Sequence, residues 1–216
     1  RQRQMCIRDS SIGGVPVTEI TKKDLMNRIA FVFQDTKLLK VSILENMRAA
    51  RPDATKEQVL NALHNAQCDD IIEKFPQGVD TILGTKGIYL SGGEQQRLAL
   101  ARAILKDAPI ILLDEATAFA DPENEYKIQL AFEHLTRGKT VLMIAHRLPT
   151  IQNADEILVL NKGTVVERGT HNALMAQGGI YATMWKDYQT SIAWNIGKGE
   201  YHACLLYTSP SPRDRG

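Results

Sequence analysis

Two uninterrupted apolar runs, IILL at 110–113 and TVLMIA at 140–145, constrain the fold of this chain more than any other feature. Strands with one solvated face alternate apolar and polar residues, whereas strands buried on both faces of a parallel sheet are apolar throughout. The stretch at 122–135 predicts a helix between the two runs, with Asp121 as its N-cap and Pro122 in its first turn. Strand, helix and strand in this order predict a parallel α/β sheet whose strands are buried on both faces.

Further predicted elements lie on both sides of this pair. RIAFVF at 28–33 predicts a third buried strand. The residues at 42–75 read as helical, and Thr55 and Gln58 fit a capping box. The remaining predictions are a helix at 92–106, a hairpin at 156–167, and closing helices at 170–176 and 180–190. The helical block between the first two strands is therefore interpreted as an inserted subdomain.

The two ends of the chain differ in character from the part between them. RQRQMCIRDS at 1–10 can be back-translated to contain AGATGTGTATAAGAGACA, and CLLYTS at 204–209 can be back-translated to its reverse complement. Inverted, identical ends of this kind resemble the adapters that transposon-based library preparation attaches to DNA fragments. We therefore expect 1–10 and 204–216 to derive from adapters and 11–203 to be native polypeptide, cut at the DNA level at both ends. The alternative is a disordered tail with a Ser-Pro-rich end.

Composition limits the classes of function that are open to the native residues. The two flanks carry five arginines and two aspartates, so leaving them out changes the formal net charge from +1 to about −2. A chain of this charge has no electrostatic footprint for nucleic acid. Cys68 is the one cysteine that is left, which excludes an internal disulfide and suits a reducing compartment. No apolar run approaches the roughly 20 residues that a membrane-spanning helix needs.

Polar residues at the ends of predicted elements are the candidates for chemistry. Asp114 and Glu115 follow the first apolar run, where two carboxylates can hold Mg²⁺ and activate water for phosphoryl transfer. Taken alone, they also fit a strand that ends in solvated acids. Ser91 and the two glycines after it open a helix whose N–H groups can bind an anion, although Ser91 also fits a simple N-cap. Gln34 and His146 follow other apolar runs and are uninformative in isolation.

The order and spacing of four segments give these candidates a common interpretation. FVFQD, LSGGEQQRLALARAIL, PIILLDEATAFADPE and VLMIAHR follow one another along the chain. Together they resemble the nucleotide-binding domain of ATP-binding cassette (ABC) transporters, and the resemblance covers nearly all of 11–203. It implies a P-loop NTPase-like parallel sheet core at 11–39 and 108–190, with an inserted α-helical subdomain at 40–107.

The resemblance implies a role for four residues in the hydrolysis of ATP with Mg²⁺. Asp114 matches the Walker B aspartate that holds the metal, and Glu115 matches the catalytic base. Gln34 matches the Q-loop glutamine, which senses Mg²⁺ and the attacking water and touches the membrane domain. His146 matches the switch histidine, which contacts the γ-phosphate and stabilises the transition state.

The signature segment is expected to act on a nucleotide that a second cassette holds. In this family the signature clamps the γ-phosphate of an ATP bound to the partner's P-loop, and the D-loop lies at the dimer interface. The residues that match the signature and the D-loop are Leu90, Ser91, Gly92, Gly93, Glu94 and Asp121. A P-loop sequence, Gly-x-x-x-x-Gly-Lys-Ser/Thr, occurs nowhere in the 216 residues. We therefore expect this chain alone to bind ATP weakly, to hydrolyse none and to leave part of its sheet exposed.

Two longer segments, LLKVSILENM at 38–47 and FPQGVDTILGTKGIYLSGG at 75–93, resemble the exporter-type branch of the family. This branch usually carries its cassette behind membrane helices. It implies a membrane domain fused upstream, a second cassette as partner and a place on the cytoplasmic face of the cell membrane. Exporter-like cassettes also serve some metal-chelate importers, so the direction of transport stays open. Thr85-Lys86 stands where exporters often carry an acidic residue, Glu94 replaces the commoner glutamine, and FADPE replaces the more frequent D-loop.

Three alternatives use the same motifs. A stand-alone importer cassette would work with separate membrane subunits. A soluble ABC ATPase of the DNA-repair or translation type would carry a coiled-coil insertion or basic patches, and the compact block between Gln34 and Ser91 argues against it. A catalytically silent partner in a heterodimer would act as a binding and regulatory module, and the presence of Glu115 and His146 argues against that role.

Overall fold

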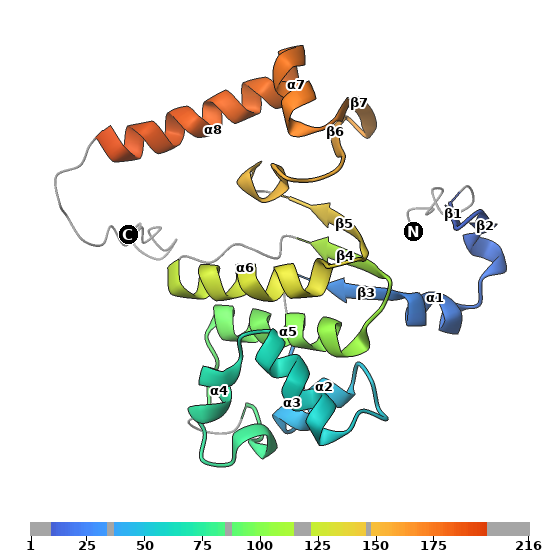
Figure 1. Cartoon of the computed structure of the whole chain (residues 1–216), viewed down its shortest axis with the longest axis vertical. Coiled ribbons are helices and arrows are strands. Elements are labelled where there is room, and N and C mark those ends of the chain that lie inside the picture. Colours follow the sequence, from blue (N-terminus) through green and yellow to red (C-terminus); the bar gives the residue numbers. More distant parts are fainter. Residues whose placement is uncertain (1–9, 34–36, 85–87, 115–121, 146–147, 198–216) are drawn as a thin grey trace, which may run out of the picture. The chain divides into compact units, whose positions relative to one another are not determined.

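The computed structural model describes residues 10–33, 37–84, 88–114, 122–145 and 148–197 (Figure 1). The chain divides into two compact units, Arg1–His146 and Arg147–Gly216. The elements of the first unit are β1 (Ser11–Ile12), β2 (Val15–Pro16), η2 (Val17–Glu19), α1 (Lys22–Arg28), β3 (Ile29–Val32), α2 (Ile43–Arg48), α3 (Lys56–Asn65), α4 (Asp69–Glu73), η3 (Gly78–Asp80), α5 (Gly92–Lys106), β4 (Ile110–Asp114), α6 (Pro122–Thr136) and β5 (Thr140–Ile144). Those of the second are η4 (Leu148–Ile151), β6 (Ile157–Asn161), β7 (Thr164–Gly169), α7 (His171–Gln177) and α8 (Ile180–Gly197).

The first unit carries a parallel sheet of three strands. β4 lies between β3 and β5, and Phe31, Leu112 and Leu142 occupy one register position across the strands. α5 precedes β4, and α6 connects β4 to β5. The parallel α/β sheet that the apolar runs predict is therefore confirmed.

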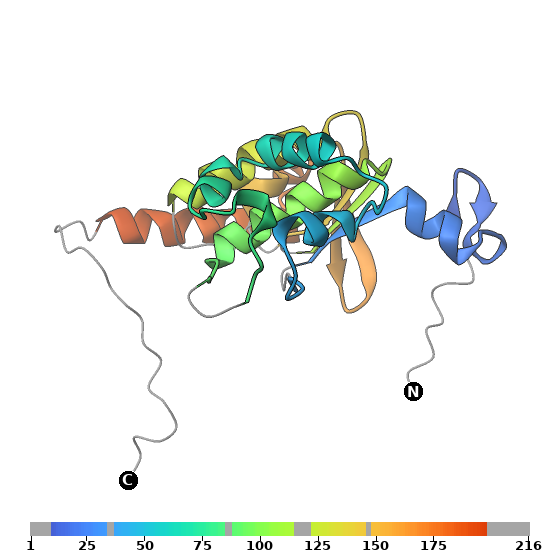
Figure 2. The same cartoon turned by 90° about the horizontal axis from the view of Figure 1, so that it is seen from below.

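Helices α5 and α6 pack side by side against one face of this sheet (Figures 1 and 2). Alternate side chains of a strand point to opposite faces, so Val32, Ile111 and Leu113 share a face. These three residues belong to the same buried cluster as Leu100 of α5 and Leu135 of α6. The sheet and its covering helices thus share a single apolar core.

In the described part of the first unit, much of the opposite face of the sheet is exposed, which corrects the prediction that these strands are buried on both faces. Phe31, Leu142 and Ile144 lie on this face, and they are 38%, 59% and 59% exposed. The strands are apolar throughout, but α5 and α6 cover only the other side. The exposed sheet region that the sequence predicts is therefore present.

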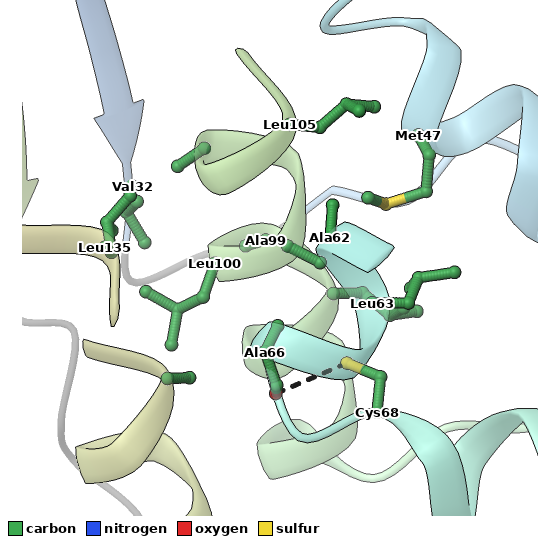
Figure 3. Packing of buried hydrophobic residues seen from close by; sticks show 14 of the residues in the cluster. Val32, Met47, Ala62, Leu63, Ala66, Cys68, Ala99, Leu100, Leu105 and Leu135 are labelled. Atoms are coloured by element: carbon green, nitrogen blue, oxygen red, sulfur yellow. Dashed lines mark hydrogen bonds between the residues drawn. The ribbon is translucent and has the colours of Figure 1, made fainter. Parts of the chain in front are cut away.

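The segment between β3 and β4 is helical, as predicted. Capping boxes start α2 and α3, and the box of Thr55 with Gln58 is the one that the sequence predicts. Figure 3 shows Met47 of α2 meeting side chains of α3 and α5 in one buried cluster. Because the core continues from the sheet into these helices without a break, the proposed boundaries of the helical subdomain stay predictions.

Cys68 lies inside this core, where its Sγ donates to the carbonyl oxygen of Ala66 at 3.5 Å (Figure 3). Burial raises the pKa of the thiol to about 12. A thiol that stays protonated at neutral pH is a poor nucleophile and a poor metal ligand. Cys68 is therefore a packing residue.

The buried side chain of Asn46 organises the loop that leads into α2. Its Nδ2 donates to three backbone carbonyl groups at 3.0, 3.2 and 3.0 Å, and its Oδ1 accepts from the amide of Leu39 at 2.8 Å. The three acceptors are Leu39, Val41 and Ser42. Arg102 of α5 donates its Nε to the carbonyl oxygen of Asn46 at 2.9 Å and its Nη1 to that of Lys37 at 3.2 Å. The loop is thus tied to the C-terminal half of α5.

A short hairpin and one unpredicted helix precede the sheet. Gly13 and Gly14 turn between β1 and β2 with φ values of 58° and 81°, which glycine adopts without strain. The sequence pattern does not predict α1, because its seven residues show no apolar stripe. Its one local signal is Thr21, whose side chain accepts from the amide of Asp24 at 3.1 Å.

The second unit is a hairpin followed by two helices. The antiparallel pairing of β6 with β7 and the helices α7 and α8 confirm the elements that the sequence predicts there. Leu174 and Tyr181 are fully buried in its small core, which Ile157 and Trp185 complete. No helix in the described part of the chain is long and apolar enough to span a bilayer.

Candidate functional site

The signature segment begins α5, and Ser91 is the N-cap of this helix. Ser91 Oγ accepts from the amide of Glu94 at 3.2 Å, and Glu94 Oε2 accepts from the amide of Ser91 at 2.7 Å. This reciprocal pair is a capping box. The hydroxyl proton of Ser91 is not used in the box, and both Ser91 and Gly92 are exposed. The first turn of α5 therefore offers a hydroxyl and backbone N–H groups to an anion, with the positive end of the helix dipole behind them.

Gly93 allows α6 to approach the first turn of α5. A Cβ atom placed on Gly93 would lie 2.8 Å from Cγ and 2.9 Å from Cβ of Asn124 in α6. Such distances are shorter than any normal carbon–carbon contact. The second glycine of the signature is therefore needed for helix packing, whatever it contributes to ligand binding. Gln95 Nε2 donates to the carbonyl oxygen of Leu90 at 2.9 Å, which fixes the backbone of the residue before the N-cap.

An ionic cluster that the sequence does not predict joins α4, α5 and α6 near this turn. Arg97 is buried and binds Asp70 through Nη1 at 2.7 Å and Nη2 at 3.1 Å, and it also donates to the carbonyl oxygen of Gln67. Lys127 Nζ lies 3.0 Å from Asp70 Oδ2. Burial opposes ionisation of Asp70, but hydrogen bonds from Arg97 and Lys127 outweigh it and lower the pKa of Asp70 to about 2.

A second ion pair lies directly at the signature. Lys74, which ends α4, places its Nζ 3.1 Å from Oε1 of Glu94. The side chain of Glu94 is 14% exposed and that of Lys74 is 48% exposed. Both ion pairs join residues 20 or more positions apart in sequence, so only the folded chain brings them together.

Asp114 is the last residue of β4, at the carboxyl edge of the parallel sheet, opposite Ile144 of β5. It is exposed, and an exposed carboxylate at this edge has the hard oxygen donors that Mg²⁺ prefers. Among the described residues, no group of three His, Cys, Asp or Glu side chains gathers in a way that could hold a metal ion.

The other predicted site residues, Gln34, Glu115, Asp121 and His146, lie outside the described residues. In sequence, Gln34, Glu115 and His146 come within two positions of the ends of β3, β4 and β5. Of the predicted site, the structure thus describes the signature turn and Asp114, and the roles of all these residues stay predictions.

An exposed helix start and an acidic residue at the carboxyl edge of a parallel sheet are features of α/β nucleotide-binding proteins. The model of the family "ABC transporter" matches residues 6–118, which is more than half of the chain. The chain belongs to the ABC transporter family and represents its ATP-binding domain.

Several curated relatives share this domain. The chain is 50% identical over 180 residues to the mycobactin import ATP-binding/permease protein IrtA of Mycobacterium tuberculosis, covering 83% of this chain and 21% of that protein. It is 47% identical over 170 residues to an ATP-dependent lipid A-core flippase of Chromohalobacter salexigens, covering 79% and 29%. The chain therefore spans between about a fifth and a third of the length of these relatives.

A solved structure supports the fold. A bacterial Atm1-family ABC exporter with ATP bound superposes with a TM-score of 0.74 at 36% sequence identity. The match covers 89% of this chain and 32% of that chain. The predicted fold class, an ABC ATPase with a parallel sheet core, is thereby confirmed.

Proposed function

We propose that this chain is the ATP-binding and hydrolysing part of an ABC transporter, in which closure of two cassettes around ATP drives a substrate across a membrane. The observation that carries the proposal is the exposed signature turn, Ser91 and Gly92, at the start of a 15-residue helix that is buried along most of its length. A long, firmly packed helix holds its terminal N–H groups in place, so an anion that binds there meets a preorganised site.

The signature turn acts on the nucleotide of a second cassette. The Ser91 hydroxyl and the N–H groups of Gly92 and Gly93 face the γ-phosphate, while Leu90 and Glu94 hold the two ends of the turn. Asp121, in the D-loop, lies at the same interface. The two cassettes close because the nucleotide binds the closed arrangement more tightly than the open one, and only that difference can shift the equilibrium.

Hydrolysis takes place at the carboxyl edge of the sheet. Asp114 would hold Mg²⁺, with Gln34 as a further contact, and the metal would supply positive charge to the transferring phosphoryl group. Glu115 takes the proton of the attacking water, and Gln34 orients that water. His146 donates to the γ-phosphate. Within these 216 residues no P-loop sequence occurs, so the P-loop that binds the nucleotide comes from elsewhere in the complete protein, and the chain alone hydrolyses no ATP.

The partner in the membrane contacts a surface formed by the loops before α2 and after η3. Leu39 and Ile82 on these loops are 54% and 48% exposed. The loops are joined by a hydrogen bond from the amide of Leu83 to the carbonyl oxygen of Val41 at 3.0 Å. Since Arg102 ties the first loop to α5, a push on this surface reaches the signature turn. The names of the relatives, an ATP-binding/permease protein and a flippase, support a membrane domain fused to the cassette and a place on the cytoplasmic face of the membrane.

The complete transporter that contains this cassette tests the proposal. We expect Mg²⁺-dependent ATP hydrolysis by the purified protein in nanodiscs. Glu115→Gln keeps the size of the side chain but removes the base, so turnover should fall by roughly two to four orders of magnitude while the closed dimer accumulates. ATPase activity that Glu115→Gln leaves intact would refute the assignment of the base.

A further inference from the structure

We infer that Lys74 is a positioning residue for the nucleotide phosphate at the signature turn, because it neutralises the charge of Glu94 there. The inference rests on the proposed function and adds to it a requirement for charge balance. It concerns Glu94, which stands where the family that the sequence resembles more often carries a neutral glutamine.

The position of Glu94 makes its charge important. Its Oε2 accepts the amide proton of Ser91 at 2.7 Å, so a full negative charge sits against the residue whose hydroxyl would face the phosphate. The side chain is only 14% exposed, so water screens this charge poorly. An uncompensated carboxylate here would repel the anion that the turn is built to bind.

Lys74 is placed to cancel this charge. Its Nζ contacts both carboxylate oxygens of Glu94, at 3.1 and 3.5 Å. The same Nζ lies 5.7 Å from the centre of the Phe75 ring, which restricts the ammonium further. With Lys74 in place, the capping box keeps its geometry and the turn presents no net negative charge.

Other cations near the turn do not substitute for Lys74. Arg97 and Lys127 both bind Asp70, at 2.7 and 3.0 Å, and so are held by that carboxylate and not by Glu94. Among the ion pairs that join described residues at this turn, the one that contains Glu94 is formed by Lys74.

Steady-state ATPase kinetics of the complete transporter test the inference. Lys74→Gln should raise KM for MgATP roughly fivefold at low salt with a smaller change in kcat, in keeping with the strength of a partly exposed charge pair. Glu94→Gln removes the charge and keeps the capping box, so the double variant K74Q/E94Q should return KM to within about twofold of wild type. Lys74→Arg keeps the charge and should retain the wild-type KM. Raising the salt concentration to about 0.5 M should shrink the effect of Lys74→Gln.

Lys56 offers the matched control. It forms an exposed ion pair with Asp80 at 2.9 Å in the same helical segment, and this pair does not include a residue of the signature turn. Lys56→Gln should leave KM unchanged. A wild-type KM in Lys74→Gln, or a raised KM that persists in K74Q/E94Q, would overturn the inference while the ATPase itself stands. Absence of Mg²⁺-dependent ATPase in the wild-type transporter would overturn the proposed function and the inference with it.

Discussion

Removing the Asn46 side chain should destabilise the fold by about 3 kcal/mol. Asn46→Ala removes Nδ2, which donates to three carbonyl groups of the loop before α2. It also removes Oδ1, which accepts from the amide of Leu39 and from Nη2 of Arg102. Leu39 is exposed, so water can replace the bonds to its backbone at little cost. The carbonyl groups of Val41 and Ser42 and the guanidinium of Arg102 are more enclosed, and each lost partner costs about 1 kcal/mol.

Urea unfolding of the purified chain measures this loss, and hydrogen exchange locates it. The amide of Leu39 donates to Asn46 Oδ1, so its exchange in Asn46→Ala should speed up by more than tenfold relative to helix amides of α5. Asn65→Ala is the control, because Asn65 makes a single exposed bond to Asn61 at 3.3 Å; its effect should stay below about 0.5 kcal/mol. A loss of less than about 1 kcal/mol in Asn46→Ala, or an unchanged Leu39 amide, would refute the reasoning.

Two further predictions concern α5 and its neighbours. Gly93→Ala gains about 1 kcal/mol of helix propensity but forces a Cβ to within 2.8 Å of Asn124, an overpacking cost of about 1–3 kcal/mol, so the melting temperature should fall. Adding Asn124→Gly removes both Asn124 atoms that lie within 3 Å of the new Cβ, so Gly93→Ala should lower the melting temperature less in the Asn124→Gly background than in wild type. Calorimetry that shows the same loss in both backgrounds would place the strain elsewhere. Because folding lowers the pKa of Asp70 from its ordinary value of 3.8 to about 2, its ionised form stabilises the fold above about pH 4, and that stability is lost as the pH falls towards 2. Asp70 is 44% exposed, so solvent screening reduces its expected contribution to the free energy of unfolding to about 1 kcal/mol. Urea unfolding at about pH 6 and about pH 3 should therefore show that wild type loses about 1 kcal/mol more stability than Asp70→Asn between these two pH values. Equal losses in the two proteins would contradict this prediction.

Local sequence signals predicted most of the elements. The unbroken runs of β4 and β5 and the Ser91-to-Glu94 cap of α5 each depend on neighbours in sequence, and the structure confirms these elements. Helix α1 was not predicted, because it has only seven residues and they show no apolar residues at helical spacing. The prediction that both sheet faces are buried was wrong. An apolar strand is compatible with burial on both faces, but its composition does not show whether the chain supplies an element to cover each face.

Tertiary contacts explain what the sequence could not supply about the site. Arg102 and Asn46 are 56 positions apart in sequence, and Lys74 and Glu94 are 20 positions apart. A local sequence pattern therefore cannot predict either contact. The motif residues could be named from their order along the chain, but their roles toward ATP stay predictions. The charge balance at the signature emerged only when α4 was seen beside the first turn of α5.

The hydrogen bonds between Arg102 and the loop before α2 attach α5 to this loop at a point far from the signature turn. Ser91 precedes Arg102 by eleven residues, which places the signature about 16 Å along the helix from the point where the loop holds it. If α5 pivots at that point, a tilt of about 10° moves Ser91 by about 3 Å, roughly the length of one hydrogen bond. A small change in the tilt of α5 at its attachment to the loop is therefore enough to bring a phosphate within reach of Ser91 or to leave it out of reach.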